Sequence, residues 1–272
     1  MRILPFRQVD VFTSKPYYGN PVAVVVGADE LETATMQRIA SWTNLSETTF
    51  LLKSKVADYK VRIFTPLQEL PFAGHPTLGS CHAALESKFI EKKKSIKQEC
   101  AAGIFDLTME DGKIFVKAPQ PKMTPVSEPI GLEVISEPIR IDVGAVWVVA
   151  EVKDAKTLAA RNPDHAVLMK LSEKHDLAGI CVFAKSDDRE TAIHVRAFAP
   201  YHAIPEDPVC GTGNISIAAY LRHRKDARFG AEYVARQGMN MGRDGRVYMR
   251  TTPDAIYLGG NSITGFEGTV RL

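Results

Sequence analysis

Hydrophobic positions along the chain fall into short strand-like segments and two longer helical ones. The short segments are rich in β-branched and aromatic residues, which predicts strands. They lie at 9–11, 22–26, 49–52 and 60–64. The longer segments, at 77–89 and 213–224, carry small and apolar residues near helical spacing and lack a clearly polar face over their first turns. That pattern is typical of a helix enclosed by sheet.

The same order of elements occurs twice. VRIFTP at 61–66 matches VRAFAP at 195–200 in four of six positions, at an offset of 134 residues. In this register Leu70-Pro71 lies over Ile204-Pro205. After three extra residues in the second copy, Ala73–His75 lies over Cys210–Thr212. Each match precedes one of the two predicted helices.

Weaker matches lie upstream in the same order. LSETTFLLKS at 45–54 aligns with LAGICVFAKS at 177–186. Gly19, followed by the apolar run 22–26, resembles Gly144, followed by the apolar run 146–149. We interpret the repeat as a duplication, although similar strand–turn–helix units can also look alike. Each half is then several strands, a glycine turn, one buried helix and further strands. The stretch 118–138 holds five prolines and predicts the linker between the halves.

Both glycine turns carry groups suited to chemistry. The first backbone N–H groups of a helix have no partner within it, so such a turn can hold a carboxylate or phosphate. His75 lies in the first turn, where a helix N-terminus favours the neutral imidazole. Glu206, Asp207 and the thiol of Cys210 surround the second, and the same position biases a thiol towards thiolate. The alternatives are glycines that merely permit the turn, a capping aspartate and a packing cysteine.

Glu47 lies at the mouth of an apolar strand, and Gly179 is its counterpart in the second half. A carboxyl in a partly apolar cleft gains a raised pKa and becomes usable for proton transfer near neutrality. The pattern around Glu47 by itself favours a solvent-exposed glutamate at a strand edge.

Composition narrows the class of protein. The chain has 272 residues, 45% apolar and 24% charged, with 34 basic against 32 acidic side chains and a formal charge of +2. This balance does not indicate a nucleic-acid partner. No apolar run approaches the roughly 20 residues that cross a bilayer. The cysteines show no CxxC spacing and His and Cys show no zinc-site spacing, so we expect reduced thiols in a cytoplasmic protein without a bound metal.

Four motifs together resemble the phenazine-biosynthesis PhzF-like family of the diaminopimelate-epimerase-like superfamily. They are GNPVAVV (19–25), NLSETTF (44–50), FTPLQELPFAGHPTLG (64–79) and EDPVCGTGN (206–214). The resemblance implies an α+β fold of two pseudo-symmetric halves, each a β-barrel-like sheet around a central helix. It also implies that the last residues return to the first domain, giving 1–118 plus 260–272 and 119–259, and that a homodimer is common.

The resemblance also implies chemistry without a cofactor, in which a carboxyl group moves a proton between carbons of a small carboxylate-bearing substrate. It implies Glu47 as the acid/base, with His75 and Asp207 as its catalytic partners. Substrate-binding positions are expected at Asn20, Gly74, Cys210, Gly211, Thr212 and Gly213. Related racemases use a cysteine in each turn, whereas Ala73 here stands opposite Cys210. We therefore expect an isomerase, the alternatives being a racemase assisted by Cys210 and a non-catalytic binding protein.

Overall fold

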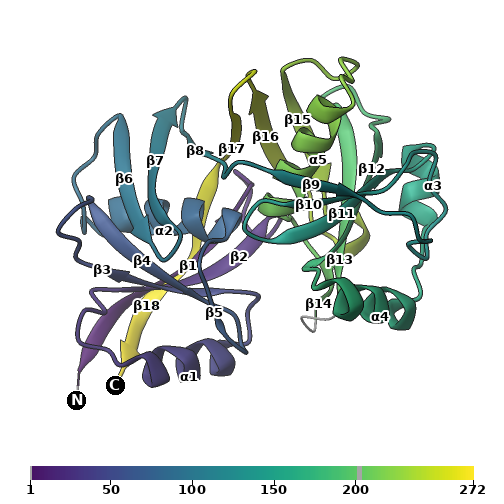
Figure 1. Cartoon of the computed structure of the whole chain (residues 1–272). Coiled ribbons are helices and arrows are strands. Elements are labelled where there is room, and N and C mark those ends of the chain that lie inside the picture. Colours follow the sequence, from purple (N-terminus) through teal and green to yellow (C-terminus); the bar gives the residue numbers. More distant parts are fainter. Residues whose placement is uncertain (1, 201–203) are drawn as a thin grey trace. The chain divides into compact units, whose positions relative to one another are not determined.

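The chain folds into two compact units. A computed structural model describes residues 2–200 and 204–272, and its path can be followed in Figure 1. One unit comprises the chain up to Lys117 together with the last segment, Gly259–Leu272, and the other spans Ala118–Leu258. Within the described residues, no helix is long and apolar enough to cross a membrane.

The first unit surrounds one helix, α2 (Gly74–Glu86), with strands on several sides. A second helix, α1 (Thr33–Thr43), lies between two of its strands in the sequence. The strands of this unit are β1 (Ile3–Val11), β2 (Asn20–Val26), β3 (Thr48–Leu52), β4 (Tyr59–Phe64), β5 (Glu69–Leu70), β6 (Ser95–Cys100), β7 (Gly103–Glu110), β8 (Lys113–Lys117) and β18 (Ser262–Arg271).

The second unit repeats this plan around α5 (Gly211–His223), with α3 (Ala155–Ala160) and α4 (His165–His175) in the place of α1. A short 3-10 helix, η2, spans Met239–Met241. The strands are β9 (Lys122–Pro125), β10 (Ile139–Asp142), β11 (Val146–Glu151), β12 (Gly179–Lys185), β13 (Ile193–Ala199), β14 (Ile204–Asp207), β15 (Glu232–Gln237) and β16 (Gly245–Thr251). Strand β17 (Ile256–Gly260) carries the chain from the second unit back into the first.

Strand pairing is the same in both units. In the first, β1 runs antiparallel to β2, β2 parallel to β3, β3 antiparallel to β4, β4 parallel to β6 and β6 antiparallel to β7. In the second, β10 to β13, β15 and β16 repeat these five relations in order. Thr48 pairs with Phe64 as Ile180 pairs with Phe198. The predicted α+β fold of two pseudo-symmetric halves is therefore correct.

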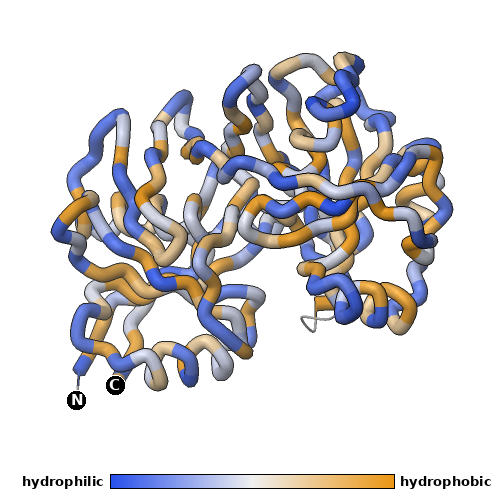
Figure 2. The backbone as a smooth tube through the Cα atoms, viewed as in Figure 1, coloured by the Kyte–Doolittle hydropathy of each residue, from blue (hydrophilic) through white to orange (hydrophobic). Residues whose placement is uncertain are grey.

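Both central helices are enclosed almost all round. Ten of the thirteen residues of α2 are buried, as are eleven of the thirteen of α5. Some strands instead alternate, as in β6, where Ile96, Gln98 and Cys100 are buried, whereas β12 and β13 are buried along almost their whole length. Alternating hydrophobic and hydrophilic colours along the strands can be followed in Figure 2. Sheet on several sides leaves the helices no polar face, which explains the absence of amphipathic patterning in their sequences.

The structure moves several predicted boundaries. Both central helices begin earlier than predicted, at Gly74 and Gly211, so Pro76 is the third helical residue. A proline in the first turn costs no hydrogen bond, because its N–H would have no partner there. The predicted linker 118–138 also contains strand β9, which pairs with β10.

The alignment of the repeat also changes ahead of the second helix. Ile63 pairs with Leu70 in the first unit, and Ala197 pairs with Asp207 in the second. Since Ile63 and Ala197 are equivalent, Asp207 corresponds to Leu70, and the three extra residues precede Glu206 rather than follow Pro205. Sequence identity at Pro71 and Pro205 had suggested the wrong register.

Candidate active site

Glu47, His75 and Asn20 lie together in the first unit. Glu47 immediately precedes β3, Asn20 begins β2 and His75 is the second residue of α2. Nε2 of His75 lies 3.2 Å from Oε2 of Glu47, and its Nδ1 lies 3.4 Å from Nδ2 of Asn20. The Glu47 side chain is only 14% exposed, so the alternative of a solvent-exposed glutamate is wrong.

Burial keeps the imidazole of His75 neutral. It lowers the pKa of His75 to about 3, although a hydrogen bond with the Pro21 backbone acts in the opposite direction. The contact with Glu47 is therefore between a neutral ring and a carboxyl group rather than an ion pair. A neutral imidazole has one donor and one acceptor nitrogen. In one tautomer Nε2 can donate a hydrogen bond to an ionised Glu47, and in the other it can accept one from a protonated Glu47.

Short polar contacts fix this cluster on the scaffold. The buried carboxylate of Asp10, on β1, accepts a hydrogen bond from the Gly19 N–H at 3.2 Å and so holds the start of β2. In the second turn of α2, the hydroxyl of Ser80 donates to that of Thr49 at 2.9 Å. Asp10 precedes the GNPVAVV motif and carried no recognisable signal in the sequence.

The second unit places Cys210, Thr212 and Gly213 around the start of α5. Cys210 is the N-cap residue, and its Sγ accepts a hydrogen bond from the Gly213 N–H at 3.3 Å. The hydroxyl of Thr212 accepts from Nε1 of Trp147 at 3.0 Å and lies 3.7 Å from the same sulfur. Trp147 was not predicted; the need of a buried indole N–H for an acceptor is the signal that could have indicated it.

The thiol of Cys210 is protonated rather than activated. Burial raises the pKa of Cys210 well above its usual value, and the nearby Asp207 charge adds to this effect. The hydrogen bond from Gly213 N–H favours the thiolate but is outweighed. The expectation that the helix N-terminus biases this thiol towards thiolate is therefore wrong, because the cost of desolvating a charge exceeds the benefit of one N–H group and the helix dipole.

The two acidic residues of the second turn have different roles. Oδ1 of Asp207 accepts a hydrogen bond from the Val209 N–H at 3.2 Å, which tightens the turn around Pro208. Glu206 instead forms two hydrogen bonds with the guanidinium of Arg196, at 2.9 and 2.7 Å. Arg62 and Glu69 form the same paired contact in the first unit. Glu206 thus belongs to a contact that both units share. Asp207 is the acidic residue of this turn that has no acidic equivalent in the first unit.

The predicted glycines lie at the two helix starts. Gly74 and Gly211 are the first residues of α2 and α5. A Cβ atom on Gly213 would lie 2.9 Å from Sγ of Cys181 and 3.1 Å from Sγ of Cys210, so only glycine fits there without a shift. The first N–H groups of each helix point out of its end and attract negative charge. In each unit, a helix N-terminus, the kind of position that can hold an anion, therefore lies beside the predicted polar residues.

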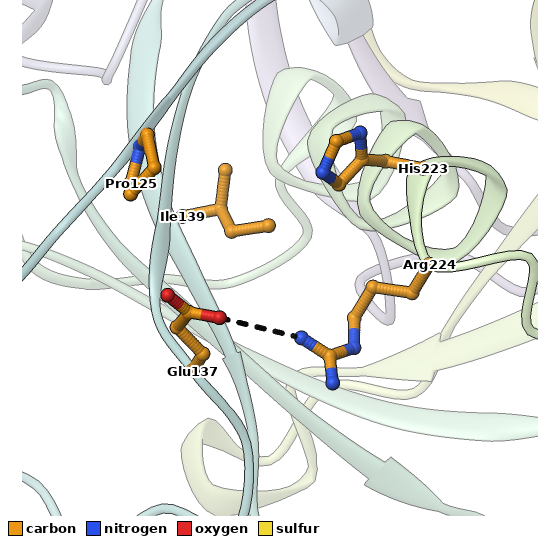
Figure 3. Close-up of a pocket in the computed structure, with 5 residues that line it drawn as sticks. All are labelled: Pro125, Glu137, Ile139, His223 and Arg224. Carbon is orange, nitrogen blue, oxygen red and sulfur yellow. Dashed lines mark ion pairs between the residues drawn. The ribbon is translucent and has the colours of Figure 1, made fainter.

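A cavity of about 300 Å³ lies at the opposite end of α5. It is lined by Pro125, Glu137, Ile139, His223 and Arg224. Arg224 and Glu137 form an ion pair at 4.0 Å, drawn as a dashed line in Figure 3. Thirteen helical residues, about 20 Å at 1.5 Å per residue, separate the cavity from the Cys210 turn. No predicted site residue lines this cavity. Among the described residues, no group of three or more His, Cys, Asp or Glu is placed to hold a metal ion.

Comparisons with known proteins identify the family of the chain and agree with its fold. The family model described as phenazine biosynthesis-like protein matches residues 9–268. "Antisense-enhancing sequence 1" of Schizosaccharomyces pombe is 36% identical, covering 97% of both chains. The "trans-2,3-dihydro-3-hydroxyanthranilate isomerase" of Pseudomonas chlororaphis is 33% identical, covering 97% of this chain and 98% of that one. A solved PhzF-family structure from Bacillus anthracis is 29% identical over the full length of both chains, with a TM-score of 0.87.

Proposed function

Since this chain belongs to the phenazine biosynthesis-like (PhzF) family, we propose that it is an isomerase that moves a proton within a small carboxylate-bearing substrate. The observation that carries the proposal is the largely buried carboxyl of Glu47 held 3.2 Å from the neutral ring of His75. A carboxyl group in such a setting can take a proton from one atom and return it to another.

The proposed reaction is internally balanced. The Glu47 carboxylate takes a proton from one substrate carbon, the electron pair shifts along the neighbouring double bond, and the protonated Glu47 returns the proton to a second carbon. No atom is gained or lost, and the group that carries the proton between the two carbons is the Glu47 carboxyl. His75 holds the carboxyl in place and accepts or donates a hydrogen bond as Glu47 changes its protonation state.

The second unit is assigned to substrate binding. Asp207 orients a polar group of the substrate, while the N–H groups at the start of α5, at Gly211 and Thr212, bind its carboxylate. In the first unit, Gly74 and Asn20 are the proposed substrate contacts. The substrate named for the relatives, a dihydro-hydroxyanthranilate, combines a carboxylate with a carbon-bound proton next to a double bond. It belongs to the class we propose here.

Proton transfer in heavy water tests this proposal. With trans-2,3-dihydro-3-hydroxyanthranilate and related cyclic carboxylates as substrates, we expect a product with solvent deuterium at carbon. Glu47→Gln should lower kcat by at least about 100-fold, the usual range for a lost general acid/base. Glu99→Gln is the control, since Glu99 lies in the same unit and pairs with Lys60 and Ser54.

Two outcomes would contradict the proposal. Full turnover by a folded Glu47→Gln variant would remove Glu47 from the mechanism. Binding of these carboxylates without any exchange or product, by the unmodified chain, would instead support a non-catalytic binding protein on the same scaffold.

A further inference from the structure

A fully buried glutamine, Gln237, connects three parts of the second turn. It is the last residue of β15 and has no exposed surface. Its Oε1 accepts hydrogen bonds from the Cys210 N–H at 3.1 Å and from Nδ2 of Asn214 at 3.0 Å. Its Nε2 donates to the Asp207 carbonyl at 2.9 Å. One side chain thus bonds the residue before the turn, the helix cap and the first turn of α5.

These contacts fix the main chain of Asp207 relative to the helix start. Pro208 follows Asp207 and removes one N–H group that could otherwise anchor the segment. Nδ2 of Asn214 also donates to the Cys210 carbonyl at 2.8 Å, which closes the network on both sides of the cap. Both ends of the 207–210 segment are therefore held by the same buried amide.

The backbone beyond Gln237 also fits closely against this turn. Gly238 has φ of +98°, and a Cβ atom there would lie 2.6 Å from the Pro208 carbonyl oxygen. A residue with a side chain could not take this place without moving the turn. The end of β15 is therefore shaped to the Asp207–Cys210 segment through its backbone as well as through Gln237.

The first unit has a buried glutamine on the equivalent strand, two positions earlier in the repeat, without this function. Gln98 on β6 is also fully buried, and its Nε2 donates to the Thr77 hydroxyl at 3.2 Å. Thr77 and Asn214 are both the fourth residue of their helix, so the contact between helix and strand is common to both units. The Oε1 of Gln98, however, accepts from the Tyr59 hydroxyl at 2.7 Å, a contact to the neighbouring strand rather than to the turn.

We propose that Gln237 is a positioning residue that holds Asp207 in register with the anion-binding N–H groups of α5. The proposal rests on the function proposed above, which assigns Asp207 and this turn to substrate binding. An apolar side chain of similar length would leave the Cys210 N–H and the Asp207 carbonyl without these partners in a buried place, and buried polar groups are strongly driven to find others. The segment would then shift, and a shift of about 1 Å in a substrate-orienting group can cost about 100-fold in rate.

Kinetics of two matched variants test the proposal. Gln237→Met should lower kcat by about 10- to 100-fold, while KM changes less than about threefold because the helix N–H groups at Gly211 and Thr212 lie outside the segment that shifts. Gln98→Met removes an equally buried amide from the first unit and should stay within about threefold of the parent in kcat. Rates are taken per folded molecule, with thermal unfolding of each variant measured in parallel.

Amide hydrogen exchange supplies a readout that does not depend on turnover. The Cys210 amide should exchange faster in Gln237→Met than in the parent chain or in Gln98→Met, because only the first variant removes its acceptor. This measurement still tests the positioning role if the parent chain shows no isomerase activity, which would be a failure of the proposed function alone.

Three results would overturn the proposal. One is an unchanged kcat in folded Gln237→Met. Another is an equal fall in kcat in both variants, which indicates loss of stability rather than of position. The third is an unaltered exchange rate of the Cys210 amide in Gln237→Met.

Discussion

The turns that begin α2 and α5 have the same scaffold and different chemistry. Each opens a thirteen-residue helix with glycine, follows an Arg–Glu pair and contacts a buried strand glutamine. The first turn has no side-chain cap and carries His75 next to Glu47, whereas the second is capped by the thiol of Cys210 and preceded by Asp207.

This difference separates the residues that build the fold from those available for chemistry. The equivalents of Glu47, Asp207 and Cys210 in the opposite unit are Gly179, Leu70 and Ala73, none of which can transfer a proton. The Arg–Glu pairs also stack on matching aromatic rings, Arg62 over Phe64 and Arg196 over Phe198. What both units retain stabilises the strands, and what only one unit has is the candidate site.

The largest structural effect is expected where each helix meets its sheet. A Cβ atom on Gly79 would lie 2.4 Å from Cγ1 of Val22 and 2.9 Å from Cγ2 of Val11. Gly79→Ala should therefore lower the free energy of unfolding by about 2 kcal/mol, with the steric cost exceeding the gain in helix propensity. Gly213→Ala, which meets sulfur atoms at 2.9 and 3.1 Å, should cost about 1 kcal/mol.

Denaturant unfolding measures both costs. Gly268→Ala is the control, because nothing lies within 4 Å of a Cβ atom placed there, and its effect should stay within about 0.5 kcal/mol. Equal stability of Gly79→Ala and the control would mean that α2 is not tightly enclosed at Gly79.

The next prediction concerns the pH dependence of stability, to which His75 contributes in the first turn only. The pKa of His75 is about 3 in the folded chain against 6.5 in the unfolded one, so the unfolded chain binds more protons between these values. The stability contribution of the neutral ring is present above pH 6.5 and is lost as pH falls towards 3. Between pH 6 and pH 4 the parent chain should lose about 2 kcal/mol that His75→Asn does not lose.

Urea unfolding at several pH values gives this difference directly. His223→Asn, at the exposed end of α5, serves as the control and should follow the parent chain. If His75→Asn has the same pH dependence as the parent, folding does not lower the pKa of His75 and the ring is charged in the folded protein at pH 4.

The smallest effect is expected at Cys210. Because burial and the Asp207 charge keep its thiol protonated, Cys210→Ser should retain kcat within about threefold, and its hydroxyl can still accept from the Gly213 N–H. Steady-state kinetics measure this, with Cys181→Ser, another buried cysteine of the second unit, as the control. A fall in kcat of more than about 100-fold with an unchanged Tm would instead support the alternative of a racemase assisted by the Cys210 thiol.

Several features could be predicted from the sequence because they depend on local pattern or on motifs. The two buried helices, the glycine turns and the repeated strand order are of this kind, as is the group of Glu47, His75 and Asn20. The register ahead of α5 could not, since matching prolines in the two copies outweighed the less visible equivalence of Glu69 and Glu206. Strand pairing, rather than residue identity, decides that alignment.

The sequence by itself determined the residue types at each turn, and with them the asymmetry between Ala73 and Cys210. Only the tertiary structure decided their ionisation and support, because both depend on groups brought from distant parts of the chain. Burial makes His75 neutral and protonates the Cys210 thiol, against what a helix N-terminus alone favours for that thiol. Gln237 lies 27 residues from Cys210 and reaches it only because β15 pairs with β13.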